Sequence, residues 1–137
     1  MNWIVAGLIA GVVAYLADWV MWSKVFGKGM EGFVTPPPAG QKVEMGSLMI
    51  KAAALALAFG VVFAYLYARF KAGLWVEGGG PLAGMEFATV LWLPTIALAT
   101  IGSGVWFDRV RPLLKAEFWS WLVRMNAAGL VTGFLIK

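Results

Sequence analysis

Two charged side chains lie inside long apolar stretches of this sequence, and they are the residues with the most chemical potential. Asp18 occurs in the apolar stretch nearest the N-terminus, and Arg124 occurs in the one nearest the C-terminus. A lone charge at mid-membrane costs at least about 2.5 kcal/mol on insertion scales, and pairing with an opposite charge reduces that cost. These two residues therefore predict a contact between the two ends of the chain.

Both charges extend a pattern of small or polar residues spaced four apart, which is the spacing of one helix face. Asp18 follows Ala6, Ala10 and Ala14, whereas Arg124 belongs with Ser120, Ala128 and Thr132. At a rise of about 1.5 Å per residue, Asp18 lies roughly 6 Å in from Trp22 and Arg124 roughly 9 Å in from Phe118. Because the depths are similar, we predict an intramembrane Asp18–Arg124 ion pair.

The role of this pair has two interpretations. It could fasten the first helix to the last, or it could form a polar site for an ion, a proton or a lipid head group. Arg124 could instead extend toward lipid phosphate, or pair with Glu117 two turns earlier on the same helix.

Other site chemistry is limited by composition. The chain has no Cys and no His, so it has no disulfide, no thiolate metal ligand and no imidazole base or haem ligand. Glu77 and Glu86 are isolated acids near the end of an apolar stretch. We expect no catalytic residues, no metal site, no cofactor and no enzymatic activity.

The elements that must position the two charges are transmembrane helices. The chain has 137 residues, of which 61% are hydrophobic and 13% charged, against about 25% charged in soluble domains. A membrane-spanning helix needs about 20 apolar residues. We predict an all-α fold: a single transmembrane domain over 1–137, an antiparallel up-and-down bundle with helices at about 3–22, 48–68, 83–107 and 118–136.

Small residues mark the predicted contact faces, because close backbone approach drives helix packing in lipid. They could all meet inside one bundle, or one stripe could face another subunit. The helix-packing residues are Gly7, Gly11, Ala52, Ala56, Gly60, Ala64, Gly129 and Gly133.

Prolines and glycines punctuate the helices and loops. Pro94 predicts a kink in the third helix. A proline triplet at 36–38 predicts a stiff spacer in the first loop, and three glycines at 78–80 predict a flexible turn in the second. We place the third loop at Asp108 to Glu117.

The distribution of basic residues predicts the orientation, since they accumulate on the cytoplasmic side. We expect both termini outside, the first and third loops in the cytoplasm, and no nucleic-acid partner. The first and third loops hold Lys24, Lys28, Lys42, Arg109, Arg111 and Lys115; the opposite side holds Arg69, Lys71 and Lys137. Most Trp residues fall at the two predicted interfaces, whereas Trp92 sits deeper.

Several short segments resemble a known family. They are Asn2-Trp3, the run from Trp22 to Lys28 with its Phe26-Gly27-Lys28, the pairs Ala58-Phe59 and Ala64-Tyr65, and Phe107-Asp108-Arg109. The chain is similar to the bacterial family called domain of unknown function 1761, whose members are small four-helix membrane proteins. The resemblance implies that architecture and a place in the bacterial inner membrane, with no assigned activity. Ser23 and Lys24 depart from the family pattern, as does the proline-rich loop.

Two functions fit these features. The first is a structural or accessory subunit of a larger membrane complex, with an energy-transducing complex as the expected setting. Its partners would be the lipid bilayer and other membrane protein subunits or copies of the chain itself. The alternative is a small oligomeric transporter or channel for an ion or small solute, supported by Asp18, Arg124, Asn126 and Pro94.

Overall fold

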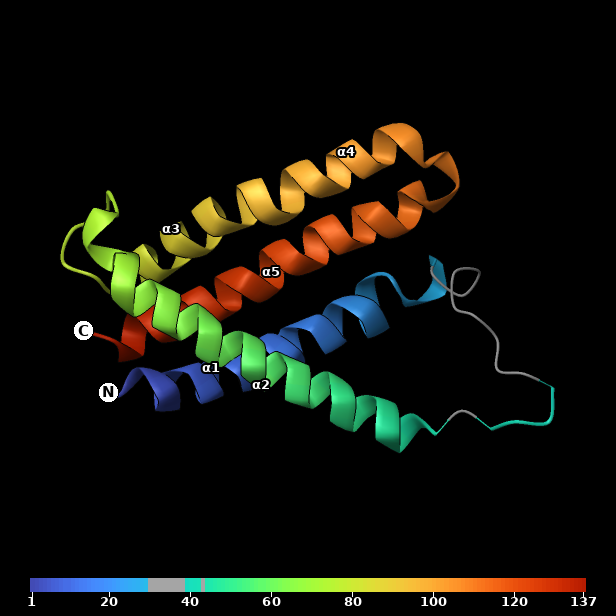
Figure 1. Cartoon of the computed structure of the whole chain (residues 1–137), viewed down its shortest axis with the longest axis horizontal. Helices are drawn as coiled ribbons and strands as arrows, with labels where there is room; N and C mark the ends of the chain where they lie inside the picture. Colours follow the sequence, from blue (N-terminus) through green and yellow to red (C-terminus); the bar gives the residue numbers. More distant parts are fainter. Residues whose placement is uncertain (30–38, 43) are drawn as a thin grey trace.

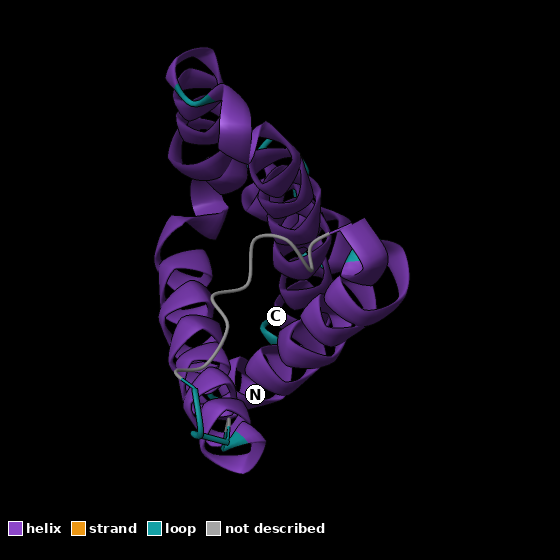
Figure 2. Ribbon diagram, turned by 90° about the vertical axis from the view of Figure 1, so that its right-hand side faces the viewer, coloured by secondary structure: helices purple, strands orange, loops and turns teal. Residues whose placement is uncertain are grey.

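A computed structural model describes residues 1–29, 39–42 and 44–137. The proline triplet at 36–38 lies outside the described residues, so its prediction as a spacer stays untested. The described residues form helices, turns and loops without a strand (Figure 2).

Five α-helices make four rods in this part of the chain. They are α1 (Trp3–Val20), α2 (Met45–Phe70), α3 (Pro81–Trp92), α4 (Leu98–Trp106) and α5 (Arg111–Leu135). A π-helical turn, Leu93–Ala97, joins α3 and α4 into one rod, and another, Met21–Val25, extends α1. Short 3-10 turns occur at Gly27–Gly29, Lys71–Gly73 and Asp108–Val110.

Successive rods run in opposite directions, as an up-and-down arrangement requires (Figure 1). Both termini lie at one end, where the Met1 ammonium nitrogen is 3.2 Å from the carbonyl oxygen of Leu135. We call this the terminus end. The other end carries the turn at Asp108–Val110 and the basic residues of the first and third connections, and we call it the basic end.

Three of the rods are long and apolar enough to cross a membrane: Trp3–Val25, Met45–Gly73 and Pro81–Trp106. The fourth span predicted from the sequence, at about 118–136, is not among them. The fourth rod, α5, has 25 residues, or roughly 37 Å, so length is not what sets it apart. Polar residues such as Arg124 and Asn126 interrupt its apolar character.

The helix ends differ from the predicted ones mainly at the basic end. The third connection is short, because α5 begins at Arg111 rather than near Phe118. Pro112 suits the first turn of a helix, and the charged residues that follow it are good helix formers once water can reach them. The helix therefore begins almost two turns before the apolar stretch.

α1 and α2 meet backbone to backbone where Gly7 and Gly11 face Gly60. A Cβ atom added to Gly7 would lie 2.6 Å from Val61 Cα, and one added to Gly11 would lie 2.6 Å from the Ala56 carbonyl oxygen. One added to Gly60 would overlap the backbone of both facing glycines. Only hydrogen fits at these three positions.

α3 and α5 make a second contact of the same kind. A Cβ added to Gly84 would overlap the backbone of Gly129, and one added to Gly129 would overlap that of Gly84. Gly133 faces the carbonyl of Gly80, which sits at a φ of 95° just before α3 begins. Close approach of two backbones thus fixes this helix pair near the terminus end.

Aromatic rings join the two glycine-packed pairs. Phe87 of α3 packs edge-on against Phe63 and Tyr67 of α2, with ring centroids 5.3 and 5.7 Å apart. All three side chains are buried. α5 also packs along α1, so the order across the structure is α2, α1, α5, then α3–α4.

At Pro94, where the sequence predicts a kink, the structure has the π-helical turn. Proline lacks the N–H that would bond to the carbonyl four residues earlier, and a π turn accommodates such a loss. The Thr95 hydroxyl donates to the Leu91 carbonyl oxygen at 2.6 Å, which satisfies one acceptor in the disturbed turn.

Replacing Gly84 by Leu should destabilise the fold by about 1–3 kcal/mol or more, because a side chain there must push α3 away from α5. Unfolding of the purified protein in detergent measures the change. Gly102→Leu is the matched control, since an added Cβ at Gly102 meets nothing within 4 Å. Equal losses for the two variants would contradict a packing role for Gly84.

Candidate functional site

Asp18 and Arg124 come together between α1 and α5. The distance from Arg124 Nη1 to Asp18 Oδ2 is 3.6 Å, and the side chains are 13% exposed for Arg124 and 29% for Asp18. Ser120, one turn before Arg124, donates its hydroxyl to Asp18 Oδ1 at 2.9 Å. The carboxylate of α1 is therefore held by two side chains from one face of α5.

The guanidinium of Arg124 lies against two aromatic rings that also contact each other. Its Cζ atom is 4.5 Å from the ring centroid of Trp121 and 5.1 Å from that of Phe59, a residue of α2. A cation over a ring face is attracted by the ring's quadrupole, most strongly where water is excluded. Arg124 therefore ties three helices together: α5 that carries it, α1 through Asp18, and α2 through Phe59.

The two contacts to the Asp18 carboxylate differ in kind. Charge-assisted N–H···O bonds usually measure about 2.7–2.9 Å, so the 3.6 Å contact is an ion pair without a short hydrogen bond. The short bond to Asp18 comes from Ser120. Arg124 Nε is buried and has no hydrogen-bond partner among the described residues.

Glu117 supports this cluster by holding Trp121, and the ion pair of Arg124 is with Asp18. The Glu117 Oε2 atom accepts a hydrogen bond of 2.8 Å from Trp121 Nε1. Glu117 thus holds the indole ring that stacks on Arg124, while the guanidinium itself contacts Asp18. Sequence spacing alone does not decide between Asp18 and Glu117 as the partner of Arg124.

Most of the predicted packing residues lie within helix contacts of the chain itself. Seven of them are buried, and Ala52 is exposed because α2 diverges from α1 toward the basic end. The buried ones are Gly7, Gly11, Ala56, Gly60, Ala64, Gly129 and Gly133.

Sequence reasoning missed three contributors to these contacts. Gly84 was not named, although it follows Gly80 and precedes Ala88 at four-residue spacing, which is a usable signal. Ser120 was placed on the face of Arg124 but given no partner. Phe59 as a cover for the guanidinium had no signal in the sequence, because it lies on another helix.

Asn126, which could have lined a polar path, is bonded within the structure. Its Nδ2 donates to the Leu122 carbonyl at 2.9 Å, and its Oδ1 accepts from the Thr89 hydroxyl at 3.3 Å. Trp92 is buried, and its Nε1 donates to the Phe118 carbonyl oxygen at 3.3 Å. These polar groups join α3 to α5.

Glu86 anchors the connection between α2 and α3. Its two carboxylate oxygens accept hydrogen bonds from the backbone nitrogens of Trp75 and Val76, at 2.7 and 2.8 Å. The glycines that follow have φ values of 82°, 74° and 95°, which other residues rarely adopt. The predicted flexible turn is thus tied to α3 by an acid that looked isolated in the sequence.

Across the residues that the structure describes, no group of three or more acidic side chains is placed to hold a metal ion. The site as a whole is a charged and aromatic junction inside a largely apolar structure. The arrangement is suited to holding α1, α2 and α5 together.

A double-mutant cycle measures the junction. Asp18→Asn and Arg124→Gln should each lower the free energy of unfolding, and the double variant should lose no more than the worse single one, a coupling of about 0.5–3 kcal/mol. The control cycle pairs Arg124→Gln with Asp108→Asn, whose carboxylate contacts Arg111. Strict additivity in the first cycle would refute the pair as a fastener.

Glu86→Gln should loosen the α2–α3 connection, because Gln has one acceptor oxygen where Glu86 uses two, one for each backbone N–H group. Hydrogen exchange should accelerate about tenfold at whichever of the Trp75 and Val76 amides loses its acceptor, in keeping with about 1.5 kcal/mol for a bond to a charged acceptor. Glu77→Gln, at an exposed acid of the same connection, serves as the control. Unchanged exchange at both amides would show that Glu86 does not anchor them.

Comparisons of the chain with family models, curated proteins and solved structures find no match. The similarity to the family called domain of unknown function 1761 therefore stays a prediction.

Proposed function

We propose that this chain is an integral membrane protein that serves as a structural subunit of a larger membrane complex, with an energy-transducing assembly as its expected setting. The observation that carries the proposal is an apolar groove on the side of the structure, between α2 and the α3–α5 pair. Its volume is about 460 Å³.

Membrane insertion is supported by what the surface exposes. Three rods are long and apolar enough to cross a bilayer, and large apolar side chains are exposed along all of them. Examples are Leu55, Leu98 and Ile101, each more than half exposed. Contiguous apolar surface of this extent is rare on a soluble monomer. Lipid, or another membrane protein, is the natural solvent for it.

α2 packs along α1 and touches α3 through the aromatic contact at Phe87. The groove lies beside this contact, where α2 and the α3–α4 rod do not pack directly on each other. Leu55, Ala58 and Val62 form its α2 wall. Leu91, Ile96 and the π-helical turn form the facing wall, and Trp121 and Met125 of α5 lie between. The Thr95 hydroxyl is already bonded to Leu91. The groove therefore suits apolar side chains of another helix, which associate in lipid by van der Waals packing.

A structural role also fits the way the chain uses its polar residues. Asp18, Arg124, Ser120 and Asn126 contact one another or neighbouring backbone groups, as described above. A transporter or channel would use such groups to line a polar path. Seven of the eight predicted packing residues are buried inside the chain, so the groove is a surface that stays open for lateral recognition.

Val62→Trp, in the α2 wall, should fill the groove and lower the amount of co-purifying partner about tenfold, since overpacking costs about 1–3 kcal/mol and 1.4 kcal/mol is tenfold. The measurement is quantitative mass spectrometry of the tagged chain after mild detergent extraction. Leu130→Trp is the control, because Leu130 is exposed on α5 away from the groove.

Unchanged melting temperatures would show that both variants fold. Migration of the unaltered chain as a lone small species, without a stoichiometric partner, would refute the subunit role. Purification of a stable, folded chain from buffer without detergent would refute membrane insertion.

A further inference from the structure

A second cavity, of about 620 Å³, lies between α4 and α5 at the basic end. Most of its lining is apolar, with Ile101 and Val105 from α4 and Leu114 and Phe118 from α5. Two basic residues of α5, Arg111 and Lys115, complete the wall on the side of the basic end. The cavity thus combines an apolar slot with a cationic mouth.

The slot exists because the two helices diverge along their length. Near the terminus end, Gly84 and Gly129 bring the backbones into contact. Further along, the rings of Trp92 and Phe118 stand between the helices, with centroids 4.7 Å apart. At Gly104 an added Cβ would meet only a Leu114 methyl group at 3.9 Å. Small residues hold the two rods together near the terminus end, and large rings part way along separate them before the basic end.

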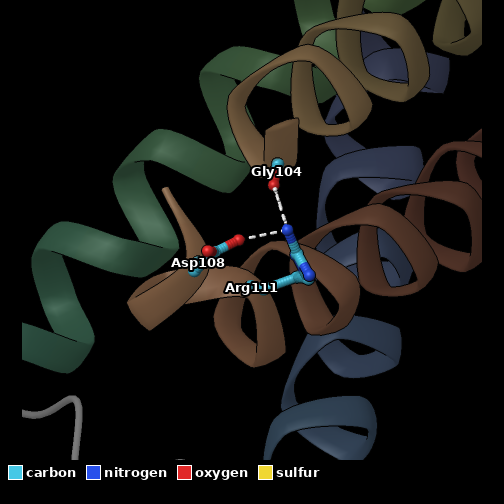
Figure 3. A network of polar contacts seen from close by, with 3 residues as sticks. All are labelled: Gly104, Asp108 and Arg111. Atoms are coloured by element: carbon cyan, nitrogen blue, oxygen red, sulfur yellow. Dashed lines mark hydrogen bonds and ion pairs between the residues drawn. The ribbon is translucent and has the colours of Figure 1, made fainter. Parts of the chain in front are cut away.

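Arg111, which lines the cavity, bridges the end of α4 and the turn before α5 (Figure 3). Its Nε and Nη2 atoms donate to the Gly104 carbonyl oxygen at 3.2 and 3.1 Å, and Nη2 also contacts Asp108. Asp108 offsets part of that charge. Lys115, one turn further along α5, is exposed, and it takes part in neither of the ion pairs found among the described residues. The mouth therefore keeps an uncompensated positive charge.

Tryptophan side chains mark the same level of the structure. Trp119 borders the cavity and is half exposed, and Trp106 at the end of α4 is 82% exposed. Indole rings favour the boundary between acyl chains and head groups. If the rods cross a bilayer as proposed, the cationic mouth lies at head-group depth and the slot lies among the acyl chains.

We propose that this cavity binds one anionic phospholipid, with an acyl chain in the slot between α4 and α5 and the phosphate at Lys115. Basic pockets between membrane helices recognise anionic head groups in this way. Arg111 frames the site, and Lys115 supplies the free charge. The inference rests on the membrane location proposed above and is independent of the structural-subunit role.

The test uses the full chain in detergent and native mass spectrometry with phosphatidylglycerol or phosphatidylcholine of identical acyl chains. The unaltered protein should retain phosphatidylglycerol preferentially. Lys115→Ala should lower that preference about fivefold, the effect expected for one basic residue near an anionic head group, and Lys115→Arg should keep it. Lys71→Ala, at the other end of the structure, should leave it unchanged.

Gly104→Leu tests the slot separately from the charge. Gly104 lines the cavity, and a Cβ there would meet only a Leu114 methyl group at 3.9 Å, so we expect a leucine to occupy the slot and reduce retention of both lipids while Lys115 is intact. Unfolding in detergent confirms that each variant is folded.

Three outcomes would overturn the site: equal retention of the two lipids by the unaltered chain, an equal loss in Lys71→Ala and Lys115→Ala, or full retention in Gly104→Leu. Full retention in Gly104→Leu would indicate that the lipid head group is attracted without an acyl chain in the slot. Because the assay contains no partner protein, its result does not depend on whether the chain co-purifies with a complex.

Discussion

Contact between helix backbones at glycine is the constraint on which the rest of this structure depends. Gly7 and Gly11 meet Gly60 in one crossing, and Gly84 meets Gly129 in the other. In the membrane location proposed for this chain, apolar burial between helices adds little free energy, so close approach and dispersion must hold them. The two crossings lie toward the terminus end, and the helices of each pair separate from there. The cavity at the basic end occupies the space that this separation leaves between α4 and α5, and the groove beside α2 lies between the two pairs.

The charged junction follows from the same geometry. Once α1 and α5 are side by side, Asp18 and Arg124 are at matching depth, and Ser120 is placed to donate to the carboxylate. Because α2 crosses α1 rather than running parallel to it, Phe59 reaches the guanidinium from a third helix. The junction lies where packing by glycine alone no longer holds the rods together. A charged and aromatic contact is well suited to that position, since it resists separation of three helices at once.

Much of this arrangement could be predicted from residue type and spacing. Apolar length indicated helical rods in antiparallel order, and four-residue spacing placed Gly60 and Gly129 on contact faces. The depth of Asp18 and Arg124 predicted their approach without any knowledge of the fold. Helix ends at charged segments were less predictable, because Lys115 and Glu117 continue a helix as readily as they end an apolar stretch.

The contacts that sequence could not predict depend on which helices become neighbours. Nothing local to Phe59 indicates a guanidinium partner, and nothing local to Glu86 indicates the backbone of Trp75. The two cavities arise from divergence between rods, which no single helix encodes. α5 is the clearest example of mixed signals, since it packs like a spanning helix but carries the polar residues that lower its hydropathy.

Distances between α3 and α5 test most directly whether glycine contact sets the arrangement. The native chain has no cysteine, so spin labels attach only at introduced sites, here the exposed positions Leu82 and Phe134. With both replaced by labelled cysteine in bilayers, we expect one short, narrow distance distribution. Adding Gly84→Leu should lengthen and broaden it, whereas Gly102→Leu should leave it unchanged. An unaltered distribution in the Gly84→Leu protein would contradict the claim that backbone contact at glycine positions these helices.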